Sequence, residues 1–233
     1  MAETRDATAT AAASAAETAA AARTAPAAAP EDCPVVVSIS RDYGAEGHEV
    51  GKLLSVKLGI PLYDNELLVR AALRTGFTED QLAAYDEKVQ GRPLALLPYV
   101  PLGKDIDSDK LFTAMRQVIL DLGLTRSCII EGRLSDYILR GNPNLIKVLV
   151  TAPMAARVRI VSEKRGLSER EGRRLVHRKQ REREEFYAHY SGGRWGLHTG
   201  KDLVVNRAEF GREGCAEIIA RAYEVKLGQA QCR

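Results

Sequence analysis

Residues 40–52 combine two closely spaced glycines with charged side chains, a pattern that could hold a phosphate group. Gly44 and Gly47 follow an apolar β-branched run, and His48 and Lys52 come soon after them. Glycines let the backbone approach an anion closely, and the N–H groups at the start of a helix point toward it. The stretch is not a Walker A sequence, because the lysine comes a turn too late and no Ser or Thr follows it. On these residues alone, a phosphate-binding loop and an ordinary strand-to-helix turn are equally open.

Arginines that could act on phosphates occur in two further places. Arg133 follows the buried-type strand 127–131, where a guanidinium can hold a phosphate through two hydrogen bonds. The charged segment 168–190 is predicted to be a long helix. Four of its residues are separated by four, three and four positions, so they lie on one face of the helix. These are Arg174, Arg178, Arg181 and Glu185. The alternative is a solvated helix covered with salt bridges.

Strands and helices must alternate to position these residues. Short apolar runs predict strands near 34–40, 127–131, 145–150 and 203–205, and residues 60–63 are predicted to be a short extended segment. Helical spacing predicts helices over 47–58, from Ser108 to 122, over 134–139, after Pro153, over 168–190 and over 211–226. Asp64 and Thr78 are read as N-caps of two further helices. This alternation is typical of an α/β fold with a parallel sheet covered on both faces. Ligands bind at the carboxyl ends of such strands, so Gly44, Asp64 and Arg133 should meet at one edge.

Composition limits the classes of protein that remain. Residues 1–33 are rich in alanine and are predicted to be a disordered tail, which leaves one domain over about 34–228. The 34 Lys and Arg nearly balance the 31 Asp and Glu, and this balance does not require a nucleic-acid partner. No apolar run is long enough to span a membrane. The four cysteines form no Cys-x-x-Cys pair, and we expect reduced thiols and a cytoplasmic location.

Several motifs, in order along the chain, resemble those of the cytidylate kinase-like family, relatives of bacterial cytidylate kinase among the P-loop nucleoside monophosphate kinases. Residues 40–51 read Ser-Arg-Asp-Tyr-Gly-Ala-Glu-Gly-His-Glu-Val-Gly, and 58–64 read Leu-Gly-Ile-Pro-Leu-Tyr-Asp. The set is completed by Gly132-Arg133, an Ala-Pro-x-x-x-Arg turn at 152–157, a lid-like helix and Trp195-Gly196. The resemblance covers about residues 35–222. It implies a P-loop kinase-type three-layer sandwich with about five parallel strands and a helical lid near 165–200.

The resemblance also implies ATP-dependent phosphoryl transfer to a nucleoside monophosphate, CMP or dCMP first, with Mg²⁺ as cofactor. It assigns the ATP phosphates to Arg41, Gly44, Ala45, Glu46, Gly47, His48 and Lys52. It assigns the acceptor nucleotide to Asp64, Arg70, Arg133 and Asp136, and catalysis to the lid arginines Arg178, Arg181 and Arg183. The usual loop hydroxyl for magnesium is absent, and Glu131 at a strand end is the candidate ligand.

Two residues depart from the family pattern. His48 stands where relatives carry arginine, and Gln180 stands where the lid usually carries aspartate. A neutral histidine would stabilise transferring phosphates much less than a permanent cation, although Arg41 or Lys52 could compensate. Two alternatives therefore stay open, a nucleotide-binding regulatory module without catalysis and a kinase for another small acceptor.

Nucleotides are the expected partners. Glutamates among the lid arginines argue against a nucleic-acid surface. The oligomeric state is not predicted.

Overall fold

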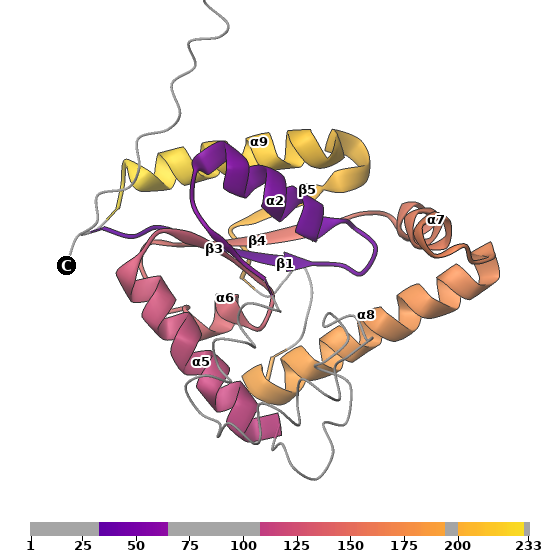
Figure 1. Cartoon of the computed structure of the whole chain (residues 1–233), viewed down its shortest axis with the longest axis horizontal. Helices are drawn as coiled ribbons and strands as arrows, with labels where there is room; N and C mark the ends of the chain where they lie inside the picture. The colour runs from indigo at the N-terminus through magenta and orange to yellow at the C-terminus, as the bar shows by residue number, and fades with distance from the viewer. Residues whose placement is uncertain (1–32, 65–107, 194–199, 231–233) are drawn as a thin grey trace, which may run out of the picture.

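The chain forms a five-stranded sheet in the order β2-β3-β1-β4-β5 (Figure 1). The computed structural model describes residues 33–64, 108–193 and 200–230. The strands are β1 Val36–Arg41, β2 Leu62–Tyr63, β3 Cys128–Glu131, β4 Leu145–Thr151 and β5 Leu203–Asn206. Every neighbouring pair is parallel. The predicted α/β fold with about five parallel strands is confirmed, and each strand lies where an apolar run or the short extended segment was predicted.

Helices cover both faces of the sheet (Figure 1). They are α2 Gly47–Leu58, α5 Ser108–Thr125, α6 Ser135–Ile138, α7 Met154–Arg165, α8 Glu169–Ser191 and α9 Arg207–Leu227. The side chains of β1 alternate between the two faces, as the period of a strand requires. Val37 and Ile39 pack in the cluster that contains residues of α2 and α9, whereas Val36 packs in the cluster of α5, α6 and α8. The sheet is therefore the middle of three layers.

Local sequence explains the ends of the long helix α8 and the kink in α9. Ser168 and Glu171 form a capping box at the start of α8, and Gly192 ends this helix in the left-handed conformation. Helix α9 begins at Arg207, earlier than predicted, because the side chain of Asn206 accepts a hydrogen bond from the Ala208 N–H. The helix is then interrupted at residue 211, a glycine with φ 69°. The predicted helix over 211–226 is the part beyond this kink.

Some predictions fall outside the described residues. These are the tail before residue 33, the helices expected after Asp64 and Thr78, Arg70, and Trp195. Within the described ranges, no helix has the length and apolar character that a membrane crossing needs.

The cysteines differ from the expectation at one position. Cys128 and Cys215 are buried free thiols, as expected. Cys33 is disulfide-bonded and 1 % exposed, so the prediction that all thiols are reduced is wrong for this residue. The sequence offered no signal for this bond, because the cysteines lie far apart along the chain and only folding can bring any two of them together.

Candidate functional site

The loop between β1 and α2 is shaped by its two glycines. Gly44 has φ 88°, and a Cβ at this position would lie 2.9 Å from the backbone oxygen of Arg157. A Cβ on Gly47 would lie 2.6 Å from the Cβ of Arg41. Glu46 is the N-cap of α2 in the left-handed conformation, and its side chain makes no capping hydrogen bond. The glycines therefore serve close packing, while the start of α2 keeps N–H groups that the Glu46 side chain does not cap.

A buried carboxylate lies directly beside this loop. Glu131 ends β3, is 1 % exposed, and pairs in register with Ile39 of β1. Its Oε1 lies 2.5 Å from Nη2 of Arg41, and its Oε2 lies 2.5 Å from Nδ1 of His48. Burial by itself raises the pKa of Glu131, but the charge of Arg41 and the hydrogen bond from His48 outweigh it and lower the pKa. Glu131 therefore stays ionised between two cationic groups.

The surroundings of His48 favour its protonated form. The hydrogen bond to Glu131 raises the pKa of His48 above its usual value, against the opposing effects of burial and of the charges on Lys52 and Arg41. His48 lies in the first turn of α2, where the helix dipole disfavours a cation. Glu131 offsets that cost. The raised pKa therefore favours the protonated imidazole at the start of α2.

The acidic side chains of the loop are also neutralised by neighbours. The Glu46 side chain is 5 % exposed and contacts Lys164 of α7 at 2.6 Å and Arg207 of α9. Asp42 accepts hydrogen bonds from Thr151 Oγ1 at 2.6 Å and from Gln180 Nε2 at 3.2 Å. Both carboxylates are therefore engaged by neighbouring cations or hydrogen-bond donors. An anionic ligand at the loop would therefore meet little uncompensated negative charge.

Arg157 supplies the clearest sign that this loop fits an anion. Its side chain is 11 % exposed and lies 4.0 Å from Asp42. Its Nε and Nη1 are buried and make no hydrogen bond with the described residues. Unsatisfied buried donors are costly, and a guanidinium prefers bidentate oxygen acceptors. Since Arg157 packs against Gly44, a phosphate on the loop is a suitable acceptor.

One face of α8 lies against the loop. Gln180 Oε1 accepts a hydrogen bond of 3.0 Å from the Tyr43 N–H, and Arg183 Nη1 donates one of 2.8 Å to the Arg41 carbonyl. The Arg183 guanidinium also lies 5.3 Å from the centre of the Tyr43 ring. Arg178 and Arg181 are exposed on other parts of the helix. Of the three predicted lid arginines, only Arg183 is brought to the loop in this conformation.

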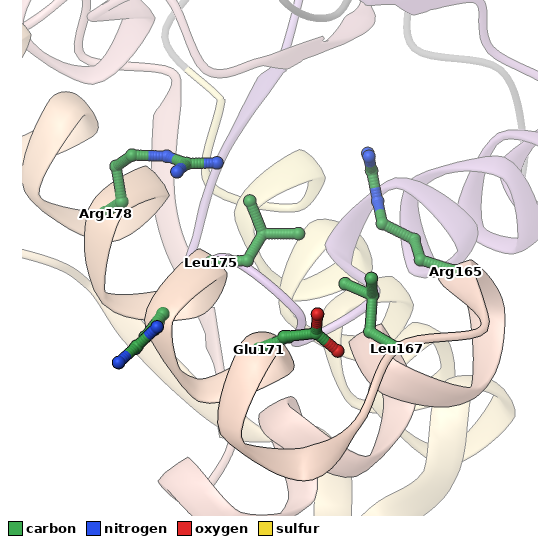
Figure 2. Close-up of a pocket in the computed structure, with 6 residues that line it drawn as sticks. Arg165, Leu167, Glu171, Leu175 and Arg178 are labelled. Atoms are coloured by element: carbon green, nitrogen blue, oxygen red, sulfur yellow. The ribbon is translucent and has the colours of Figure 1, made fainter.

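Arg178 instead lines a basic hollow between α7 and α8 (Figure 2). The hollow has a volume of about 560 Å³ and is lined by Arg165, Leu167, Glu171, Arg174, Leu175 and Arg178. Figure 2 shows the guanidinium groups of Arg165 and Arg178 on opposite sides of Leu175. Glu171 Oε2 is engaged by the hydroxyl of Ser168 at 2.5 Å, and this bond lowers the pKa of Glu171. The three arginines therefore give the hollow a positive rim.

The predicted acceptor residues lie at neighbouring strand ends. Gly132, Arg133 and Leu134 all have positive φ, from 55° to 70°, so the chain after β3 makes a left-handed turn. The Arg133 guanidinium lies 5.7 Å from the ring centre of Phe186 on α8. Asp64 directly follows β2. The expected meeting of loop, Asp64 and Arg133 at one sheet edge agrees with the parallel topology.

Three predicted residues have different surroundings from those expected. Asp136 is buried and binds the ammonium group of Lys201, so its carboxylate is engaged within the protein. Lys52 is exposed and lies 3.7 Å from Glu49 on α2. Both oxygens of Glu131, the candidate magnesium ligand, already contact cations. Within the described ranges no group of three or more His, Cys, Asp or Glu side chains could hold a metal. The roles predicted for these residues remain predictions.

Sequence reasoning missed Lys201 and the contacts of Gln180. Lys201 stands in a short polar stretch before β5, and no motif distinguishes it from surface lysines. Gln180 was noted as a departure from the family pattern, but its bonds to Tyr43 and Asp42 follow from the rotation of α8. That rotation is set by buried positions such as Val176 and Tyr187, which are sparse in a highly charged segment.

Together, the sheet order, the glycine loop and the helical lid define a P-loop kinase-type α/β protein. The family model for the cytidylate kinase-like family matches residues 36–209, and the chain belongs to this family. The cytidylate kinase of Archaeoglobus fulgidus is 26 % identical over 200 residues, which cover 82 % of this chain and 95 % of that protein.

Two solved structures share the fold. An uncharacterized protein from Eubacterium ventriosum has a TM-score of 0.61 at 20 % identity, covering 82 % of this chain and 98 % of that one. TT1252 from Thermus thermophilus has a TM-score of 0.50 at 21 % identity, covering 84 % and 98 %. At these identities the two structures support the fold alone. Membership of the cytidylate kinase-like family supports a phosphotransferase.

Proposed function

We propose that this protein is an ATP-dependent nucleoside monophosphate kinase that acts in the cytoplasm, with CMP or dCMP as its first acceptors. The name and coverage of the archaeal relative support the acceptor class. The observation that carries the proposal is the bridge from Arg41 through Glu131 to His48. It favours the protonated form of an imidazole in a loop that lacks the usual lysine.

The proposed reaction needs positioning and charge stabilisation rather than a covalent intermediate. The first N–H groups of α2, with His48 and Arg157, would bind the phosphates of ATP. Bound Mg²⁺ would supply further positive charge at the β- and γ-phosphate oxygens. Arg133 would bind the acceptor phosphate, and Arg183 would neutralise charge that develops during transfer.

Glu131 is the candidate magnesium ligand, and it is engaged in two contacts in this structure. Glu131 could take that role only by giving up Arg41 or His48, since each of its oxygens lies 2.5 Å from one of them. Arg41 or His48 would then be available to the phosphates. Otherwise the ion would be held by the phosphates and water, as Mg²⁺ often is.

A second candidate function is a nucleotide-binding regulatory module without turnover. It is favoured by the internal ion pairs of the loop, where Glu131 and Glu46 already occupy four basic side chains. Binding of a nucleotide would not require these pairs to break, whereas catalysis needs charge that acts more strongly on the transition state.

Steady-state ADP release separates the two candidates. The purified full chain is assayed with ATP, Mg²⁺ and each of CMP, dCMP, UMP, AMP and GMP, beside calorimetric titration with ATP. The expected result is turnover that is fastest with CMP or dCMP. Arg173→Ala is a matched lid control, because Arg173 is exposed and pairs only with Glu169 at 3.0 Å among the described residues. ATP binding without turnover for every acceptor would support the module instead.

A further inference from the structure

A buried polar cluster lies between the sheet and α8, next to the candidate site. The Lys201 side chain is 1 % exposed, and its ammonium group binds the Asp136 carboxylate, which is 4 % exposed. The same ammonium donates a hydrogen bond of 2.8 Å to Ser40 Oγ. Tyr187 of α8 lies with its hydroxyl 3.5 Å from Asp136 Oδ2. One cation thus joins β1, α6 and, through Asp136, the lid helix.

Stability alone does not explain this pair. Removing two charges from water costs several kcal/mol per ion, and replacing a buried pair by apolar groups is often neutral or stabilising. The apolar residues on this side of the sheet include Val36, Ile130 and Leu145, and the buried polar groups beside the pair are neutral serines, two of which, Ser38 and Ser135, hydrogen-bond to each other at 2.6 Å. A lysine and an aspartate at this place therefore need another reason.

The neighbours of the cluster give that reason. Ser40 directly precedes Arg41, which binds Glu131. Asp136 follows the left-handed turn that carries Arg133. Tyr187 lies one helical turn beyond Arg183, whose guanidinium binds the Arg41 carbonyl. The phosphate loop, the Arg133 turn and α8 each have a residue in the Lys201 cluster, or within a few positions of it along the chain.

We propose that Lys201 is a positioning residue whose pairing with Asp136 and Ser40 holds the lid helix and the Arg133 turn in register with the phosphate loop. This inference deepens the proposed kinase function and rests on it. Lys201 touches no substrate in this arrangement, because its side chain is enclosed. Its effect acts through Arg183 and Arg133, which must face the phosphates together.

The test removes both charges at once. Lys201→Met alone leaves a buried aspartate unpaired and is expected to destabilise the fold strongly. The double variant Asp136→Asn/Lys201→Met leaves no unpaired charge and should melt near the wild-type temperature. Its kcat with CMP should fall about tenfold or more, since small misplacements of reacting groups cost rate. Its affinity for ATP should stay within about twofold, because the loop itself is unchanged.

A neighbouring pair that is closer to the surface, between Lys147 and Asp202, provides the matched control. Lys147 Nζ lies 3.5 Å from Oδ1 of Asp202, and Asp202 directly follows Lys201 in the chain. The variant Lys147→Met/Asp202→Asn removes the same charges at the surface, where ion pairs contribute little. It should leave kcat unchanged. Equal kcat in both double variants would overturn the positioning role.

Two further outcomes are decisive. A rise confined to the KM of the acceptor would assign Asp136 to direct acceptor binding and overturn the proposal. Failure of the double variant to fold would make the pair structural and overturn it too. Hydrogen exchange of the α8 amides gives a readout without activity. Faster exchange around Arg183 and Tyr187 in the Asp136→Asn/Lys201→Met variant, absent from the surface control, supports the positioning role even if the wild type phosphorylates nothing, and unchanged exchange there overturns it.

Discussion

The imidazole of His48 lies with Nδ1 2.5 Å from Oε2 of Glu131, across the interface between the first turn of α2 and the end of β3. The carboxylate is buried and also contacts Arg41. A histidine at the start of a helix would ordinarily lose its proton more easily, because the dipole repels positive charge there. Here the net effect is the opposite, and the pKa of His48 is raised. A buried acid thus makes this histidine a better substitute for arginine.

The first prediction concerns the pH dependence of ATP binding. A group with a raised folded pKa keeps its stabilising charge below the ordinary value of about 6.5 and loses it only as the pH rises through the folded pKa. We therefore expect the affinity for ATP to weaken as the pH rises through the raised pKa of His48, with a midpoint above about 6.5. Calorimetric titration between about pH 6 and pH 9 measures this.

The control for that prediction is His48→Arg, which is charged throughout the range. Its affinity should stay constant where that of the wild type falls, so the two proteins should differ most at high pH. The same variant should increase turnover more at high pH than near pH 6. Parallel pH profiles for the two proteins would show that His48 does not act on the nucleotide.

The second prediction concerns the space at Gly47. A Cβ there would lie 2.6 Å from the Cβ of Arg41, and displacement of Arg41 would disturb its ion pair with Glu131. Gly47→Ala should lower the free energy of unfolding by about 1–3 kcal/mol and weaken ATP binding. Urea unfolding and titration with ATP measure the two effects.

A second glycine of the same helix is the control. A Cβ on Gly51 would meet Leu62 at 3.4 Å, an ordinary contact, so Gly51→Ala should be neutral or slightly stabilising. If both alanine variants behave alike, the close approach of Gly47 to Arg41 has no energetic consequence, and the loop tolerates a side chain.

Much of the fold followed from short local patterns. Apolar β-branched runs indicated the strands, and glycines indicated helix ends. One of these is Gly59, which ends α2 in the left-handed conformation. These signals are local, and a parallel sheet needs only their order along the chain. The same holds for the loop, where two glycines between a strand and a helix indicated its place. The meeting of Arg41 and Glu131 was not predictable, because it depends on which strands become neighbours.

The orientation of α8 shows where sequence reasoning stopped. The charge spacing favoured a face with Arg178 and Arg181, but the face against the loop carries Gln180 and Arg183. A helix packs the side that carries its apolar residues against the core. In α8 the buried ones are Val176 and Tyr187, and Phe186 and Tyr190 pack beside Tyr187. Charged residues far outnumber the apolar ones in this segment, so the charge spacing alone indicates the wrong face for the contact with the loop.

The third prediction concerns Glu46, which neutralises Lys164 and Arg207. Glu46→Gln keeps the size of the side chain and its left-handed backbone but removes the charge. We expect a loss of about 1–3 kcal/mol in the free energy of unfolding, below the range for fully buried pairs because Lys164 is half exposed. Urea unfolding measures it. Glu49→Gln, at an exposed pair in the same helix, should change stability by less than about 0.5 kcal/mol. Equal losses would mean that burial of Glu46 adds nothing.

The last prediction separates the lid arginines. Arg183 donates a hydrogen bond to the Arg41 carbonyl and lies over the Tyr43 ring, whereas Arg181 is exposed. If the conformation described is the one that acts, Arg183→Ala should lower kcat by about 10- to 100-fold, because a cation beside the transferring phosphate is lost. Arg181→Ala should lower kcat by less than about threefold. Arg183→Lys keeps the charge without the planar fork and should fall between the two. Steady-state kinetics with CMP and ATP, beside equilibrium ATP binding, give the comparison. Equal losses in both alanine variants would require α8 to rotate or close during turnover, so that Arg181 also reaches the phosphates.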